Sequence, residues 1–161
     1  MSVHQPGGAG GGSQTVQRVT GTLTSADLIL LGSVGWHTIE LVPVAAGEVA
    51  VGVAASFSFL PVTTPYVVDP GNALCFAAGD QGWNTWFNIV MTGLLDQTEK
   101  VNLNGPSSSG PLGPDTMPQW AGKGGGHLTV ALSNDPGGSP DITGGDGELF
   151  YDITYVVLGG L

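Results

Sequence analysis

The chain has 161 residues, of which 13 are Asp or Glu and only three are Lys or Arg, so that its formal net charge at pH 7 is -10. This length suits one domain with tails and excludes two domains of ordinary size. Because Arg18, Lys100 and Lys123 are far apart in the sequence, there is no basic cluster for nucleic acid or anionic lipid, and neither is an expected partner.

The total charge content is also low. Charged residues make up 10% of the chain, where roughly 25% is usual for a soluble domain. A surface with so few charges is typical of a subunit whose faces are covered by neighbours in an assembly. The alternative is a stable, weakly charged secreted domain that its negative net charge keeps dispersed.

Residues 1–14 are predicted to form a flexible arm ahead of a domain that spans residues 15–161. The arm holds the glycines Gly7, Gly8, Gly10, Gly11 and Gly12. These residues bury too little apolar area to offset their backbone entropy. Because they have no side chains to clash, the arm can lie flat across a neighbouring subunit and serve assembly, with a plain flexible leader as the alternative.

From Thr15 onwards, apolar residues alternate with a period of two, which predicts half-buried strands. The clearest case is residues 49–59. One predicted face holds Val49, Val51, Val53, Ala55, Phe57 and Phe59. The opposite face holds only Ala50, Gly52, Ala54, Ser56 and Ser58. A face of such small residues indicates close approach by a second layer or a neighbouring chain, or a tightly packed interior strand.

The remaining predicted elements complete an all-β domain. Further strands are expected at residues 15–22, 37–42, 73–78, 85–92, 100–103, 127–132 and 149–157. Residues 24–31 begin with N-cap residues and end at Gly32, which predicts one short helical turn. About eight strands predict a single β-sandwich or jelly-roll-like domain with long Gly/Pro-rich loops after Asn104 and after Asn134.

The sequence offers few parts for chemistry. His4, His37 and His127 stand in no recognisable catalytic or metal-ligand pattern, and Cys75 lies in an apolar run that predicts a buried hydrophobe. We therefore expect no enzyme, no catalytic residue, no cofactor and no metal site. A start without a signal peptide and the lack of a long apolar run predict synthesis in the cytoplasm, away from membranes.

Two residue sets remain as candidate sites. The acidic loop with Asn134, Asp135, Asp141, Asp146 and Glu148 is either ordinary turn chemistry or a calcium site, and Asp141 with Asp146 could form a hydrolytic pair. Three tryptophans are candidates for intersubunit anchors, core packing or stacking platforms for sugar rings, namely Trp83, Trp86 and Trp120.

The order of elements resembles a known group of proteins. The elements that carry the resemblance are the turn at residues 24–30, a strand that ends with Leu41-Val42-Pro43, and the tight turn at residues 45–47. They are followed by the long strand to Phe59, the segment Thr63-Thr64-Pro65-Tyr66 and the final strand at residues 150–155. Over residues 20–70 and 145–158 the chain resembles small β-sandwich structural proteins of tailed bacteriophage virions, particularly capsid decoration, or cement, proteins.

This resemblance implies a protein on the capsid surface of a virion, made in the host cytoplasm. Such proteins are often homotrimers that bind the major capsid protein, clamp neighbouring capsomers and have no active site. The alternative within the same virions is a tail or fibre subunit that recognises host glycans or another receptor.

Overall fold

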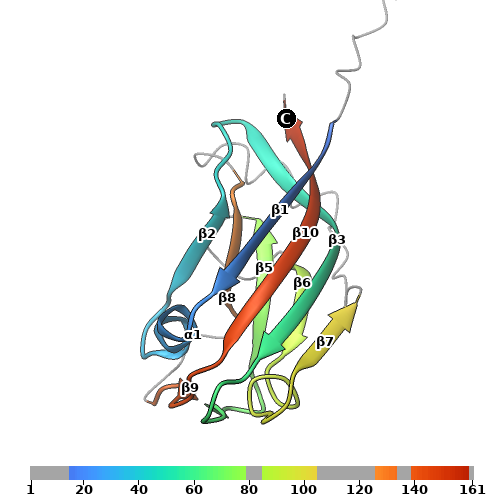
Figure 1. Ribbon diagram of the computed structural model, residues 1–161. Coiled ribbons are helices and arrows are strands. Elements are labelled where there is room, and N and C mark those ends of the chain that lie inside the picture. The colour runs from blue at the N-terminus through green and yellow to red at the C-terminus, as the bar shows by residue number, and fades with distance from the viewer. Residues whose placement is uncertain (1–14, 79–84, 105–125, 134–138, 160–161) are drawn as a thin grey trace, which may run out of the picture.

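The computed structural model describes residues 15–78, 85–104, 126–133 and 139–159. Over these residues it contains two four-stranded antiparallel sheets that pack face to face, in the orders β1-β10-β3-β7 and β2-β8-β5-β6, and the short pair β4-β9 (Figure 1). The strands are β1 (Val16–Leu23), β2 (Thr38–Val42), β3 (Glu48–Leu60), β4 (Val67–Val68), β5 (Ala73–Ala78), β6 (Thr85–Val90), β7 (Val101–Asn104), β8 (Leu128–Leu132), β9 (Ile142–Thr143) and β10 (Glu148–Gly159).

The predicted all-β sandwich is confirmed. All eight predicted strands are present, with ends that differ from the prediction by two residues at most, and the two-residue strands β4 and β9 were not predicted. The predicted arm, residues 1–14, lies outside the described residues, as do residues 105–125 of the first predicted Gly/Pro-rich loop and residues 134–138 of the second.

The hydrophobic core lies between the two larger sheets. Phe57 and Phe59 of β3 and Ile153 of β10 face Phe76 of β5 and Val130 of β8, and all five are at most 3% exposed. Aromatic contacts join the sheets, since Phe76 packs against both Phe57 and Tyr151. Burial of these large side chains supplies the main driving force for the sandwich.

A β-bulge in β3 divides its predicted apolar face. Ala54 pairs with Thr154 and Gly52 pairs with Tyr155, so Val53 is an extra residue with no partner on β10. Because one extra residue reverses which side chains point inward, Val53 is 56% exposed while Ala50 is fully buried. The prediction of a continuous apolar face is therefore wrong at Val53.

The predicted small face of β3 is divided at the same place. Gly52 lies in the interior, where an added Cβ would come within 2.7 Å of the Phe87 ring. Beyond the bulge, Ala54, Ser56 and Ser58 lie on the outer face of the sheet, opposite Thr154, Asp152 and Phe150 of β10. The expected close approach by a second layer therefore holds at Gly52, whereas the outer half of the face is left open in this chain.

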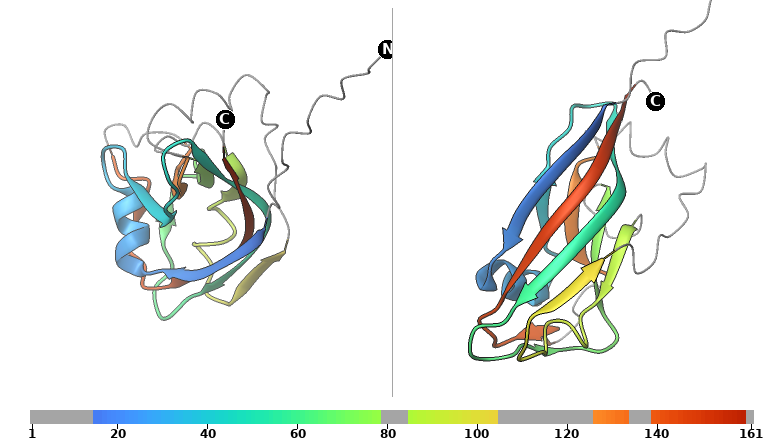
Figure 2. Two further views of the ribbon diagram at one scale, coloured as in Figure 1. Left: turned by 90° about the horizontal axis from the view of Figure 1, so that it is seen from above. Right: turned by 45° about the vertical axis from the view of Figure 1, so that its right-hand side comes forward.

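Helix α1 (Ser25–Gly32) confirms the predicted helical turn. Thr24 is its N-cap in a capping box, in which the Asp27 carboxylate accepts a hydrogen bond from the Thr24 backbone N–H at 2.9 Å. Gly32 belongs to the helix itself, and an added Cβ there would lie 2.3 Å from Ile142 Cβ. The helix fills the space between the edge strands β1 and β2 (Figure 2). In the part of the chain that the structure describes, no helix has the length and apolar character to cross a membrane.

Candidate functional site

A shallow groove runs along β3 on the outer face of the β1-β10-β3-β7 sheet. Its floor is formed by Ala54, Ser56 and Ser58, which are too small to fill the space between their neighbours. The walls are side chains of β1, β10 and β7: Arg18, Phe150, Asp152, Thr154, Asn102 and Asn104. Two adjoining hollows of about 290 Å³ and 360 Å³ share Ser56 and Asp152, so they form one continuous depression.

The charges in the groove neutralise each other. Arg18 donates from Nε to Asp152 Oδ1 at 2.7 Å and from Nη2 to Asp152 Oδ2. The hydrogen bond from Arg18 lowers the pKa of Asp152, and the same contact raises the pKa of Arg18. Both side chains therefore stay ionised over a wide pH range, and this pair presents no net charge to a partner.

The rest of the groove is polar, with one aromatic ring. Ser58 Oγ donates a hydrogen bond to Asn102 Oδ1 at 2.8 Å, which leaves the Asn102 amide nitrogen directed to other acceptors. Asn104, two residues further along β7, is exposed at the same groove. Phe150 is 40% exposed, although aromatic rings are usually buried. The groove thus offers amides, hydroxyls and one apolar ring, which suits binding and provides no activated nucleophile.

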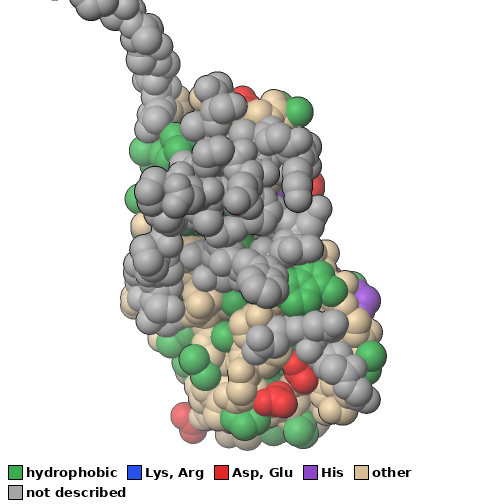
Figure 3. Space-filling view, turned by 180° about the vertical axis from the view of Figure 1, so that it is seen from behind, with side chains coloured by type: hydrophobic (Ala, Val, Ile, Leu, Met, Phe, Trp, Pro, Cys, Tyr) green, Lys and Arg blue, Asp and Glu red, His purple; other side chains and the backbone are tan. Residues whose placement is uncertain are grey.

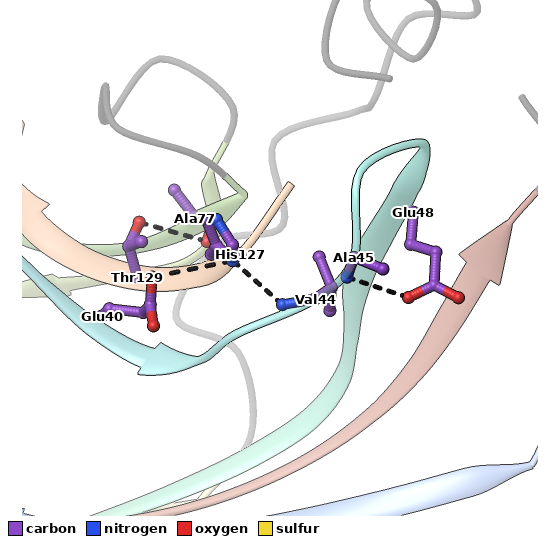
Figure 4. Close-up of polar contacts among 7 residues, drawn as sticks. All are labelled: Glu40, Val44, Ala45, Glu48, Ala77, His127 and Thr129. Carbon is purple, nitrogen blue, oxygen red and sulfur yellow. Dashed lines mark hydrogen bonds and ion pairs between the residues drawn. The ribbon is translucent and has the colours of Figure 1, made fainter. Parts of the chain in front are cut away.

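A second polar cluster ties the ends of three strands together (Figure 4). The Val44 backbone N–H donates to His127 Nδ1 at 2.9 Å, and Glu40 Oε2 lies 3.6 Å from the same nitrogen. At the same end, the Ala45 N–H donates to Glu48 Oε2 at 3.1 Å. Since Nδ1 accepts a hydrogen bond, the neutral ring carries its proton on Nε2. In this arrangement the His127 ring fixes the turn between β2 and β3.

The acidic residues after β8 hold loops together. Asp146 accepts hydrogen bonds from the backbone N–H groups of Thr63 at 2.9 Å and Thr64 at 2.8 Å, and from the Thr63 hydroxyl. These bonds, that of the Thr63 hydroxyl foremost, lower the pKa of Asp146. Asp141 is 9% exposed and accepts from the Asn72 side-chain amide. Each carboxylate therefore serves its own loop contact.

Over the described residues, no group of three or more His, Cys, Asp or Glu side chains is placed to hold a metal ion. Asn134 and Asp135, which the sequence suggested as further calcium ligands, lie outside the described residues. Cys75 is 1% exposed, and burial raises the pKa of its thiol to about 12, which confirms the predicted buried hydrophobe.

Of the three tryptophans predicted as anchors or stacking platforms, only Trp86 is among the described residues, and Trp83 and Trp120 lie outside them. Trp86 is 6% exposed and belongs to the hydrophobic core, so its ring has no free face for a sugar in this conformation. Phe150 was not predicted as a site residue. Its neighbours Leu149 and Tyr151 are also apolar, so the sequence does not indicate which face of this strand is exposed.

Several apolar side chains lie on the surface. On α1 and just after it, Ile29, Leu30 and Val34 are 39%, 47% and 53% exposed. Elsewhere the large exposed residues are Val16, Val53, Leu60, Val62, Val67, Val90 and Phe150. On the back of the molecule, no Lys or Arg side chain is visible among the coloured residues (Figure 3). The described surface thus carries few basic side chains and several exposed apolar ones.

Comparisons with known proteins give one structural likeness. No protein-family model and no curated protein matches the chain. A solved structure, the capsid asymmetric unit of cyanophage Pam1, is similar to it with a TM-score of 0.37 and 14% sequence identity, over 97% of this chain and 93% of that chain. We base the proposed function on the residues of the chain itself.

Proposed function

We propose that this protein is a non-enzymatic structural subunit of a bacteriophage virion, a capsid decoration, or cement, protein that oligomerises and clamps neighbouring capsid subunits. The observation that carries this proposal is the outer face of the β1-β10-β3-β7 sheet, where the charges of Arg18 and Asp152 neutralise each other in an ion pair. The other groove residues are small, polar or aromatic. A broad neutral face of this kind suits contact with protein neighbours.

The exposed apolar residues support the same function. Ile29 and Leu30 of α1 and Val34 just after it are exposed within six residues of the chain, and apolar side chains of this kind suit contact with a protein neighbour. In a homotrimer, such surfaces can bind between copies or to the major capsid protein. A trimer presents three copies of each such surface and would engage several capsomers at once, and this multivalency can strengthen attachment by roughly 10²- to 10⁴-fold over one contact.

Localisation on the particle tests the proposal. Immunogold labelling of purified virions of the virus that carries the gene should place the protein over the capsid surface, with gold absent from the tail. Light scattering of the purified chain should give three times its mass of 16.3 kDa. Virions without any label would contradict a structural role, and a stable monomer on the capsid would contradict the homotrimer.

The second candidate is a tail or fibre subunit that binds a glycan or another receptor. The observation that favours it is Phe150, an exposed ring across the groove from the amides of Asn102 and Asn104, since sugars are commonly bound between an aromatic face and polar groups. Gold label confined to the tail, together with glycan-array binding that Phe150→Ala abolishes, would establish this function in place of the first.

A further inference from the structure

We propose that the groove along β3 receives the glycine-rich arm of a neighbouring copy of this chain, in an extended conformation with residues 7–12 over Ala54, Ser56 and Ser58. This inference rests on the proposed function, because it needs an oligomer, and it names the surface on which the arm binds. The arm's sequence and the groove's geometry support it independently.

The floor of the groove fits a backbone without side chains. From Ala54 to Ser58 the floor spans about 13 Å, at about 3.3 Å per residue along a strand. Residues 7–12 contain five glycines and Ala9, and they extend over about 20 Å at the same rise. A segment that lacks Cβ atoms can approach a floor of Ala and Ser closely, whereas an ordinary segment would place large side chains against the walls.

The walls supply partners for peptide groups. A side-chain amide has the same donor and acceptor as a backbone peptide, and Asn102 and Asn104 present two of them along one wall. They stand two residues apart on β7, about 6.6 Å, which is also the repeat of same-side peptide groups in an extended chain. An extended glycine segment can therefore pair with both amides in register.

The neighbouring copy is the source that the topology favours. The arm joins the domain at Thr15, and Val16 pairs with Val156, toward the end of β10 that is remote from Phe150. To reach its own groove, the arm would have to reverse direction at Thr15 and cross β10, which lies between β1 and β3, together with the Arg18 side chain. An arm from a neighbour has no such constraint, and a cyclic exchange of arms closes a symmetric oligomer.

Disulfide trapping tests the inference directly. The Gly10→Cys variant is mixed with the Ser56→Cys variant, and the covalent dimer formed under mild oxidation is measured by non-reducing electrophoresis. The native Cys75 adds little background, because it is 1% exposed and its pKa is raised to about 12. The control partner is Val67→Cys, which is 71% exposed on β4 and outside the groove.

We expect at least about 10-fold more dimer with Ser56→Cys than with Val67→Cys, since a bound arm holds its thiol at a high effective concentration. Equal yields would overturn the inference. So would a bond that forms only within single chains carrying both Gly10→Cys and Ser56→Cys, because it would place the arm on its own groove. Glycan binding lost in Asn104→Ala and Phe150→Ala, without arm trapping, would assign the groove to a sugar.

The same trapping, done on the free protein and on capsid particles, separates this inference from the proposed function. A trapped dimer from a protein that never binds capsids would support the arm site and refute the cement role. A capsid-bound oligomer with no trapped dimer would refute the arm site alone.

Discussion

The rings of Phe57 and Phe76 pack against each other across the two sheets, with centroids 4.7 Å apart and planes tilted by 42°. Phe57 comes from β3 and Phe76 from β5, so this contact joins the halves of the sandwich. Phe76→Ala should lower the free energy of unfolding by about 3 to 5 kcal/mol, measured by denaturant titration. The matched control is Phe150→Ala, which removes a 40% exposed ring and should cost far less. Equal losses in the two variants would contradict the assigned core.

Gly52 is required by the close approach of β3 to β6. An added Cβ would lie 2.7 Å from Phe87 Cε2 and 3.0 Å from Trp86 Cβ. We therefore expect Gly52→Ala to lower the free energy of unfolding by about 1 to 3 kcal/mol. Gly159→Ala is the control, because its Cβ would meet only ordinary contacts, the nearest 3.5 Å away at Glu48. A Gly52→Ala protein as stable as the control would show that the two strands can separate freely.

Asp146 should contribute to stability in a pH-dependent way. Its hydrogen bonds from Thr63 and Thr64 lower its pKa in the folded state below the unfolded value of about 3.9. Its contribution is therefore complete above the unfolded pKa and is lost as the pH falls through the folded pKa. Asp146→Asn should flatten the loss of stability in acid, measured as unfolding midpoints between pH 2 and 6. Glu99→Gln, at an exposed position without such hydrogen bonds among the described residues, removes the same charge and is the matched control.

Cys75 should be unreactive in the folded protein. Because the thiolate is the reactive form and burial raises the pKa of this thiol to about 12, Ellman's reagent at pH 8 should react at the rate of unfolding. Addition of denaturant should make the reaction fast and complete. Rapid reaction of one thiol in the native protein would contradict the burial of β5 between its neighbours β6 and β8.

His127 should protect the turn between β2 and β3 from opening. His127→Ala removes the acceptor of the Val44 N–H. We expect faster hydrogen exchange at the Val44 amide, while amides in the centre of β10 keep their protection. His37→Ala, at another partly buried histidine, is the control. Unchanged exchange at Val44 would show that the ring does not fix the turn.

Much of the fold could be predicted from the sequence, because the alternation of apolar and polar residues indicates which side chains of a strand are buried. The strands around Phe57 and Ile153 were predicted for this reason, whereas the strand around Phe76, which is apolar throughout, was a weaker candidate. The helix was marked by N-cap residues at its start and by Gly32 at its end. The bulge at Val53 was not predicted, since it depends on the pairing of β3 with β10, and residues 49–59 alternate without interruption. The short strands β4 and β9 arise from one tertiary contact between distant segments.

The groove could not be predicted from the sequence for a related reason. Ser56 and Ser58 stood out as small residues, but their neighbours Asn102 and Phe150 are brought beside them only by the order of strands in the sheet. The three tryptophans were predicted as candidate site residues because large aromatic side chains are enriched at binding hot spots. Trp86 packs in the core, which was one of the alternatives for these residues, and the exposed aromatic ring on the groove is Phe150.

The most direct test of the cement role is co-sedimentation of the purified protein with capsid particles that lack it, over a range of concentrations. If the protein is a cement protein, its binding should saturate at a fixed number of copies per capsomer. A folded variant without residues 1–14 should bind more weakly. Absence of saturable binding by the full-length protein, while it is folded and oligomeric, would contradict the cement role.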